Sequence, residues 1–319
     1  MFVQILILIL GFFLLYKGSG LLVDGSTSLA QKLKISSLVI GLTIVAFGTS
    51  LPELFINLCS NFYQLPDIGI GSVIGANIAS ILLITGLSAL ICPILIKKEL
   101  IRKELPLAIF AILLLLILAN NFFTGVNATS FIGRIDGIIF LIFFLIFLYY
   151  AIGRAKKEKA PLLLPKKINW LIAIAYMIIG IAGLAVGSSF VIMSGSKIAT
   201  GLGLTNAAIA LSIIAIGMTL PEMFTAVRAS WQKNTDLAIG NIVGSIMFNI
   251  LFILGLSSLI KPLPYNHGFN TEIIIGLMSV LLIYYFTLNG KKERKLERWE
   301  GGLLLAFYIA YLAFVIFRT

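Results

Sequence analysis

Apolar residues run along the chain in long stretches that are interrupted mainly by Gly, Pro and short charged segments. Each stretch is close to the roughly 20 residues that a helix needs to cross a bilayer. The stretches lie near residues 2 to 22, 37 to 61, 68 to 96, 105 to 124, 131 to 152, 168 to 190, 205 to 230, 237 to 260, 271 to 288 and 300 to 317. The pattern predicts an all-α polytopic membrane protein with ten transmembrane helices.

An internal repeat relates the two halves of the chain at an offset of 169 residues (210 minus 41). The stretch "GLTIVAFGTSLPELF" at 41 to 55 aligns with "ALSIIAIGMTLPEMF" at 210 to 224, and "IGSVIGANIASILLITGLSAL" at 70 to 90 aligns with "IGNIVGSIMFNILFILGLSSL" at 239 to 259. Because each half holds five predicted spans, the second half enters the membrane from the opposite side. We therefore expect two inverted five-helix repeats, at 1 to 152 and 168 to 319, joined by a short charged linker at 153 to 167.

The basic residues fall in alternate loops. The chain is 60% hydrophobic and 12% charged, with a net charge of +11. With the amino terminus outside, the cytoplasmic loops hold nineteen Lys and Arg residues, whereas the outer loops and the carboxyl terminus hold four. This positive-inside pattern places both termini on the extracellular or periplasmic side of the cell (inner) membrane. The cationic charge is therefore topological, and we expect a lipid-embedded chain, functional as a monomer, with no nucleic-acid partner.

Two carboxylates lie deep within predicted spans, and the repeat makes them equivalent. Of thirteen acidic residues, only Glu53 and Glu222 have this position. A carboxylate at the bilayer centre costs at least about 2.5 to 3.5 kcal/mol, so it is expected to face a cavity and to have a partner. Without an intramembrane Lys or Arg, that partner is expected to be a cation. The alternative is a pair of protonated glutamates that hydrogen-bond between helices.

Each glutamate follows a helix-breaking proline and glycine. Pro52 lacks an N–H and obstructs the carbonyl of Gly48, and Pro221 stands in the same relation to Gly217. Carbonyl oxygens of Ala46 and Ala215 could then point at an ion, which membrane structure tolerates only where the backbone lines a cavity. The alternative is a plain proline kink, but a kink duplicated beside a duplicated glutamate favours an ion site.

Further oxygen atoms surround the two glutamates. Thr49 lies four residues before Glu53, so an unbroken helix would place both on one face. Together the carboxylates, carbonyls, amides and hydroxyls form a hard-oxygen set that suits Ca²⁺. The candidate ligands are Glu53, Glu222, Thr49, Ser50, Thr219, Ser80, Asn249, Ser245, Ala46 and Ala215. The small residues of the same segments are expected mainly to allow close helix packing; they are Gly71, Gly75, Ala76, Ala79, Gly240 and Gly244.

The motifs "VAFGTSLPEL" and "GSVIGANIASILLITGL", repeated as "IAIGMTLPEM" and "GNIVGSIMFNILFILGL", resemble the two alpha repeats of the cation/calcium antiporter superfamily. The resemblance covers nearly the whole chain and is closest to the prokaryotic sodium/calcium exchangers. It implies the sodium/calcium exchanger fold and a secondary antiporter that exchanges Ca²⁺ for Na⁺ by alternating access, with both ions as substrates and no cofactor. Spans 1 and 6 would be the gate helices that slide past the other eight spans.

The resemblance also implies roles for individual residues. Glu53 and Glu222 match the family's principal Ca²⁺ ligands, and Ala46, Thr49, Ala215 and Ser245 match residues that supply sodium-site oxygens. Four positions depart from the family pattern: Met218 and Ala76 stand where hydroxyl residues are expected, Ser80 replaces an asparagine and Asn249 an aspartate.

These departures leave the counter-ion open. Protons could replace Na⁺, since protonation of both glutamates would release Ca²⁺. Mg²⁺, Mn²⁺, or K⁺ with Na⁺ are further cation choices. A channel would need a continuous pore, which inverted repeats with one carboxylate pair do not favour. An enzyme is not expected, because the spans hold no His/Asp or Ser/Lys constellation, nucleotide loop or haem ligand pair.

Overall fold

The computed structural model describes residues 2–63, 66–96, 100–120, 131–155, 169–201, 215–289 and 295–318. The elements of the first repeat are α1 (Phe2–Lys32), α2 (Ser37–Ile40), η1 (Gly41–Val45), α3 (Ala46–Thr49), α4 (Leu51–Phe62), α5 (Pro66–Ile78), η2 (Ala79–Ile84), α6 (Thr85–Ile91), β1 (Ile94–Leu95), η3 (Leu100–Glu104), α7 (Leu105–Ala119), β2 (Phe131–Ile132) and α8 (Arg134–Ala155). Those of the second repeat are α9 (Trp170–Gly201), α11 (Ala215–Met218), α12 (Leu220–Trp231), α13 (Thr235–Met247), η5 (Phe248–Leu254), α14 (Gly255–Ile260), β3 (Leu263–Pro264), η6 (His267–Phe269), α15 (Asn270–Asn289), β4 (Lys295–Leu296) and α16 (Arg298–Arg318).

The predicted all-helical membrane architecture is confirmed. Within the described ranges, seven helices are long and apolar enough to cross a membrane, and the pair 37–49 with 51–62 makes an eighth if it is one bent span. The two remaining predicted spans, 105 to 124 and 205 to 230, run into residues outside the described ranges. In the described parts of these two spans, α7 is helical, and residues 215 to 231 are helical apart from the break at Thr219.

Two spans form the centre of the bundle. In the stretch 235–260, which joins α13, η5 and α14, 94% of the residues in the most apolar 18-residue window are buried, and the share in 67–91, which joins α5, η2 and α6, is 72%. The five other long spans are only 22% to 39% buried, as expected for helices whose outer surface faces lipid. The repeat relates these two central spans, so the core consists of one equivalent helix from each half of the chain.

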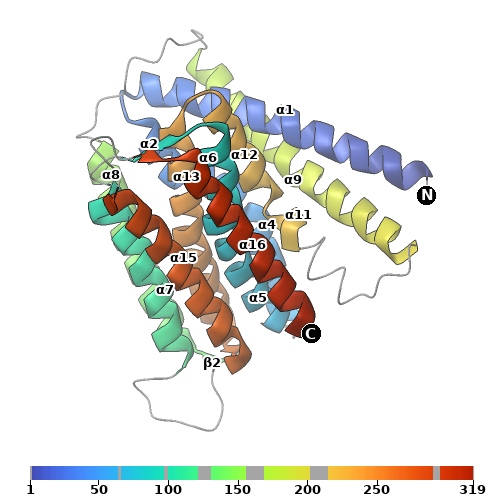
Figure 1. Ribbon diagram of the computed structural model, residues 1–319, viewed down its shortest axis with the longest axis vertical. Helices are drawn as coiled ribbons and strands as arrows, with labels where there is room; N and C mark the ends of the chain where they lie inside the picture. The colour runs from blue at the N-terminus through green and yellow to red at the C-terminus, as the bar shows by residue number, and fades with distance from the viewer. Residues whose placement is uncertain are drawn as a thin grey trace.

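Helices α1 and α9 lie side by side across one face of this bundle, and the amino-terminal end of α1 extends beyond it (Figure 1). They are antiparallel, because Gly11 faces Gly187 whereas Gly18 faces Gly180. A Cβ atom on Gly18 would lie 2.9 Å from the Gly180 carbonyl oxygen, so the two backbones touch directly. Close approach through small residues is the usual way in which membrane helices associate without a hydrophobic driving force.

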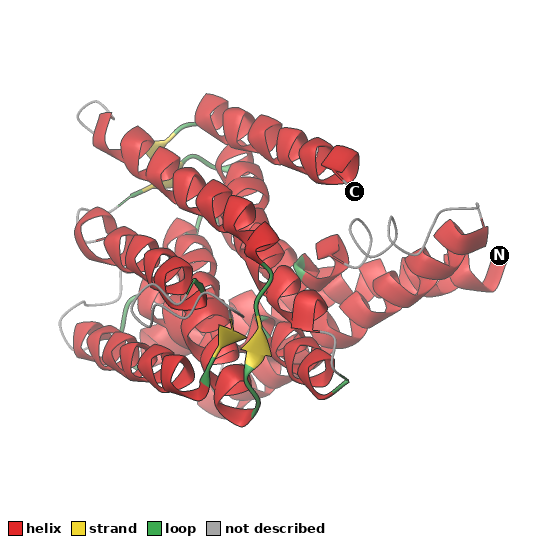
Figure 2. Cartoon of the chain, turned by 90° about the horizontal axis from the view of Figure 1, so that it is seen from below, coloured by secondary structure: helices red, strands yellow, loops and turns green. Residues whose placement is uncertain are grey.

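Two short antiparallel strand pairs join the repeats at opposite ends of the bundle (Figures 1 and 2). At one end β1 pairs with β4, and at the other end β2 pairs with β3. In each pair, the segment that follows the third span of one repeat meets the segment that precedes the fifth span of the other. This reciprocal pairing is the pattern that two inverted repeats predict.

A further buried carboxylate lies at the amino-terminal edge of α7, just outside the predicted span 105 to 124. Glu104 is fully buried at the end of η3 and forms an ion pair with Arg154 of α8. The Tyr150 hydroxyl also donates to Glu104 Oε1, at 2.6 Å. Unlike Glu53 and Glu222, Glu104 therefore already has a cationic partner from the protein itself.

Candidate functional site

The predicted helix breaks occur in both repeats. The helix ends at Thr49 and restarts at Leu51, with Ser50 at φ −86° and ψ 5°, and the two parts are bent by 44°. In the second repeat, α11 ends at Met218, Thr219 has φ −85° and ψ 0°, and α12 follows. Each proline enters the first turn of the new helix, where its missing N–H costs nothing.

Both glutamates begin the new helices and are completely enclosed. Glu53 and Glu222 lie in the first turns of α4 and α12, and their relative exposures are 0% and 2%. A helix amino terminus favours negative charge, which partly offsets the burial of a carboxylate. Nevertheless, an ionised carboxylate in a buried place needs a partner for its charge. Among the residues that the structure describes, neither glutamate pairs with a basic side chain.

Five buried oxygen atoms at these segments have no hydrogen-bond partner in the described part of the chain. They are Glu53 Oε1, Glu53 Oε2, Glu222 Oε2, Ser245 Oγ and Asn249 Oδ1. Buried polar atoms are nearly always hydrogen-bonded, because leaving one unsatisfied costs about 1 to 3 kcal/mol. Four of the five are pure acceptors when the glutamates are ionised, and Ser245 Oγ can accept as well. Oxygen acceptors of this kind are the ligands that a hard cation needs.

Ser50 connects the two repeats directly. Its hydroxyl donates to Glu222 Oε1 at 3.0 Å, from the break of one repeat to the carboxylate of the other. The equivalent Thr219 does not make the reciprocal bond, since its hydroxyl donates to the Ile216 carbonyl at 3.0 Å. The two halves of the candidate site are therefore related in sequence but different in hydrogen bonding.

Thr49 does not share a helical face with Glu53, because the helix breaks between them at Ser50. Its hydroxyl instead lies 3.1 Å from Asn241 Oδ1 and close to carbonyl oxygens of its own helix. Asn241, which is fully buried on α13, also donates to the Glu222 carbonyl oxygen at 3.4 Å. Asn241 thus links the two breaks. The repeat does not mark this role, because the counterpart of Asn241 is Ser72 and not a second amide.

The backbone carbonyls differ from the expectation in the first repeat. The Ala46 carbonyl accepts the Ser50 N–H at 3.0 Å, so the break does not release it, and only its second lone pair could serve an ion. In the second repeat the Thr219 N–H bonds to the Ile216 carbonyl instead of the Ala215 carbonyl. Ala215 therefore agrees with the expectation better than Ala46 does.

The Gly217 carbonyl, to which Pro221 cannot donate a hydrogen bond, accepts one from α9 instead. Gly217, four residues before Pro221, accepts a hydrogen bond from the Ser188 hydroxyl of α9 at 2.5 Å. The equivalent Ser19 of α1 bonds within its own helix, to the Tyr16 carbonyl at 3.0 Å. The α9 helix is therefore anchored at one break, whereas α1 makes no matching bond through Ser19.

Ser80 and Asn249 lie in repeat-equivalent turns of π-helix, η2 and η5. Such turns are rare and often occur at functional sites, because the wider turn displaces side chains from the regular helical face. Both residues are buried. The Asn249 side chain donates from Nδ2 to Asn77 Oδ1 at 3.1 Å. Asn77 is a second buried amide that the repeat does not reveal, since its counterpart is Ile246.

Small residues bring the central helix of the second repeat against the broken helix of the first. A Cβ atom on Gly240 would lie 2.5 Å from the Leu38 carbonyl oxygen, and one on Gly244 would lie 2.6 Å from the Ala46 Cβ. These two glycines therefore allow close packing, as predicted. By the repeat, Gly75 is expected to pack against residues 211 to 215, and part of this stretch lies outside the described residues.

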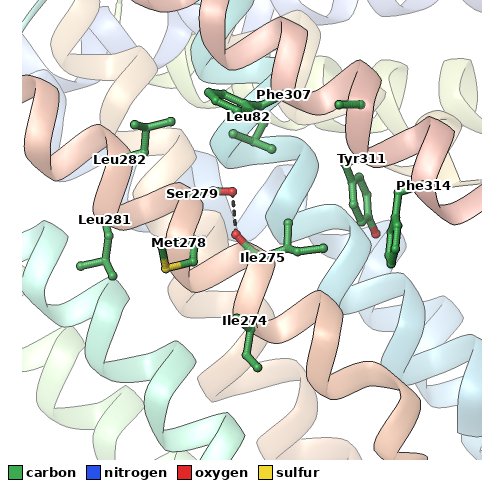
Figure 3. Close-up of a pocket in the computed structure, with 11 residues that line it drawn as sticks. Leu82, Ile274, Ile275, Met278, Ser279, Leu281, Leu282, Phe307, Tyr311 and Phe314 are labelled. Atoms are coloured by element: carbon green, nitrogen blue, oxygen red, sulfur yellow. Dashed lines mark hydrogen bonds between the residues drawn. The ribbon is translucent and has the colours of Figure 1, made fainter.

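An open groove on the bundle has few of the oxygen atoms that a cation needs as ligands. A groove of about 620 Å³ lies between α15 and α16, with Leu82 of η2 in its wall (Figure 3). Its lining is apolar apart from Ser279 and Tyr311, and the Ser279 hydroxyl donates to the Ile275 carbonyl at 2.7 Å. The candidate cation site is therefore the enclosed cluster around the two glutamates and not this open groove.

Replacing Ser50 by Ala should lower kcat/KM for Ca²⁺ about tenfold, because a hydrogen bond to a charged group contributes about 1.5 to 3 kcal/mol. Ca²⁺ flux into reconstituted vesicles measures this change. Ser279→Ala is the matched control, since that hydroxyl bonds within its own helix to the Ile275 carbonyl and lines the apolar groove. Equal activity of the two variants would show that the bond from Ser50 to Glu222 is not needed.

Comparison with known proteins agrees with this architecture. The family model described as sodium/calcium exchanger protein matches residues 3–153 and 172–317. A membrane protein of Methanocaldococcus jannaschii is 32% identical over 305 residues, which cover 96% of this chain and 95% of that protein. The sodium/calcium exchanger MaX1 of Methanosarcina acetivorans is 29% identical over 351 residues and 99% of each chain.

The solved structures include the sodium-calcium exchanger NCX_Mj, soaked with 10 mM Na⁺ and no Ca²⁺. It superposes on this chain with a TM-score of 0.82 at 31% identity, over 97% of this chain and 98% of that one. The family match extends over both repeats, and the fold agrees with that of an exchanger. The chain therefore belongs to the sodium/calcium exchanger protein family of multi-pass membrane transporters.

Proposed function

We propose that this protein exchanges Ca²⁺ for Na⁺ across the cell membrane, with Ca²⁺ bound between Glu53 and Glu222. The observation that carries the proposal is the set of buried oxygen atoms without partners in the described chain, on the two glutamates that follow the helix breaks and on Ser245 and Asn249 of the central span. Two carboxylates can neutralise one divalent cation, and the amide and hydroxyl oxygens would complete the six to eight ligands that Ca²⁺ prefers. NCX_Mj and MaX1 are named sodium/calcium exchangers, which supports the same pair of ions here.

The ligand set that we propose contains the ten residues predicted from the sequence, with different weights. Glu53, Glu222, Ser245 and Asn249 offer buried acceptors that nothing else in the described chain occupies. Ser50 and Thr49 would orient the Glu222 side of the site. The remaining members are Thr219, Ser80, Ala46 and Ala215, of which the two alanines would act through their carbonyl oxygens.

Proton coupling is the second candidate, because two hydroxyls expected for sodium sites are missing. Met218 is buried where the first repeat has Thr49, and Ala76 is buried where the second repeat has Ser245. Neither side chain can coordinate Na⁺. If fewer Na⁺ ions bind, protons on the two glutamates would be the natural counter-ions for releasing Ca²⁺.

The counter-ion can be determined with purified protein in proteoliposomes. We expect Ca²⁺ uptake when Na⁺ is loaded inside and diluted outside, with no imposed pH difference. Uptake that requires a pH gradient and ignores the Na⁺ gradient would overturn Na⁺ coupling in favour of protons. A clamp of the membrane potential adds the stoichiometry, since three Na⁺ per Ca²⁺ would be electrogenic and two would not.

We also propose the orientation and the organisation of the chain. The alternating positive charge supports both termini on the outer side and the linker 153 to 167 in the cytoplasm, between repeats 1 to 152 and 168 to 319. One chain holds both halves of the candidate site, which supports a functional monomer. Labelling of single cysteines placed in the linker and near the termini of intact cells tests the orientation.

A further inference from the structure

In the described chain, only one end of the Asn249 side-chain amide, which belongs to the candidate site, has a hydrogen-bond partner. Asn249 of η5 donates from Nδ2 to Asn77 Oδ1 at 3.1 Å, and both side chains are almost completely buried. Its other end, Oδ1, is buried and has no partner in the described chain. Asn77 belongs to α5 of the first repeat and Asn249 to the second, so this bond crosses between the two halves of the protein.

The two ends of a carboxamide are nearly equal in size but opposite in their chemistry. The oxygen accepts hydrogen bonds and binds cations, whereas the NH₂ group donates and repels them. A half-turn about the last side-chain bond exchanges the ends, so a buried asparagine needs a neighbour to fix its orientation. A carboxylate at the same place would need no such neighbour, because its two ends are both oxygens.

We propose that Asn77 is a positioning residue that holds the NH₂ group of Asn249 and thereby directs the Asn249 oxygen at the transported cation. The inference rests on the proposed cation site. It explains how an uncharged amide can serve at position 249, where the resemblance leads us to expect an aspartate. Under the repeat, Ile246 corresponds to Asn77 and Ser80 corresponds to Asn249. The Ile246 side chain cannot accept a hydrogen bond, and the Ser80 side chain contains no amide whose orientation must be fixed.

The proposal predicts that the effect of Asn77 depends on residue 249. Asn77→Leu keeps a similar volume but removes the acceptor, so Asn249 can turn its NH₂ group to the cation. We expect the KM for Ca²⁺ to rise about tenfold, with a smaller change in kcat. In an Asn249→Asp background the same Asn77→Leu change should raise KM twofold or less, because an aspartate presents oxygen in either orientation.

The experiment is a double-mutant cycle of the wild type, the two single variants and the double variant, all in proteoliposomes. An equal rise of KM in both backgrounds would show that Asn77 only fills space, and an unchanged KM for Asn77→Leu would show that it has no role; either result overturns the proposal. If Asn77→Leu is not recovered as folded protein, Asn77→Ala removes the same acceptor.

Ca²⁺-dependent thermal stabilisation in detergent repeats the cycle without transport. This second readout distinguishes a wrong counter-ion assignment from a wrong assignment of the Ca²⁺ site. If the counter-ion assignment is wrong, transport under a Na⁺ gradient fails in the wild type, but the stabilisation by Ca²⁺ still reports the interaction of Asn77 with Asn249. If Ca²⁺ does not stabilise the wild type at all, the proposed site fails and the inference about Asn77 fails with it.

Discussion

Glu53→Gln and Glu222→Gln should each lower Ca²⁺ transport at least about a hundredfold while the protein still folds and inserts. Each change keeps the shape of the side chain but removes one of the two buried charges that would neutralise the divalent cation. Removing one partner of a buried charge pair costs about 3 to 5 kcal/mol, which corresponds to more than a hundredfold in affinity. Ca²⁺ uptake into proteoliposomes, normalised to the amount of inserted protein, measures the loss.

Stability measurements separate a lost ligand from a misfolded variant. In the absence of Ca²⁺, neither substitution should lower Tm, because each keeps the side-chain volume and removes a buried carboxylate that has no basic partner in the described chain. Added Ca²⁺ should raise the Tm of the wild type but not that of the variants. Asp67→Asn is the matched control, since this carboxylate is exposed at the start of α5. Robust Ca²⁺ transport by either glutamine variant would refute the assignment of that glutamate as a ligand.

Arg154→Met should destabilise the protein by about 3 to 5 kcal/mol without acting on the ion site. Arg154 forms an ion pair with Glu104, which is fully buried, and the substitution would leave that carboxylate without its cationic partner. The bond from Tyr150 alone cannot supply the missing charge. Thermal unfolding in detergent, followed by the fraction of monodisperse protein, measures the loss of stability.

The double variant Glu104→Met with Arg154→Met is the decisive control. Replacing both members of a buried ion pair by apolar residues of similar volume is often neutral or stabilising, because the desolvation cost disappears together with the attraction. We therefore expect the double variant to be more stable than Arg154→Met alone. A double variant less stable than the single one would show that packing at this position, and not charge, sets the loss.

Most of the fold was predictable because the bilayer leaves few options. Long apolar stretches must be helices, and an odd number of spans in each half forces the repeats to be inverted. The helix breaks at Ser50 and Thr219 were likewise predictable, since Pro52 and Pro221 cannot continue a helical hydrogen-bond pattern. The family resemblance rested on these same segments and is confirmed.

The contacts that complete the site depend on neighbours distant in sequence and were not predictable. Glu104 lies in a run of charged residues that is typical of a loop, yet η3 turns it inward to meet Arg154, fifty positions later. Asn77 aligns with Ile246 and Asn241 aligns with Ser72, so the alignment shows no repeated amide that would mark either residue. The π-helical turn of η2 contains neither Gly nor Pro, the residues that mark irregular backbone in a sequence.

The repeat relates any displacement of α1 and α9 toward one membrane face to an equivalent displacement toward the other face. Under the offset of 169 residues, the contact between Gly11 and Gly187 becomes the contact between Gly180 and Gly18. These glycine contacts are therefore exchanged with one another by the repeat, and by themselves they favour neither membrane face. Which side is open would then be decided by the ions that are bound and by the membrane potential, each of which can shift such a balanced equilibrium.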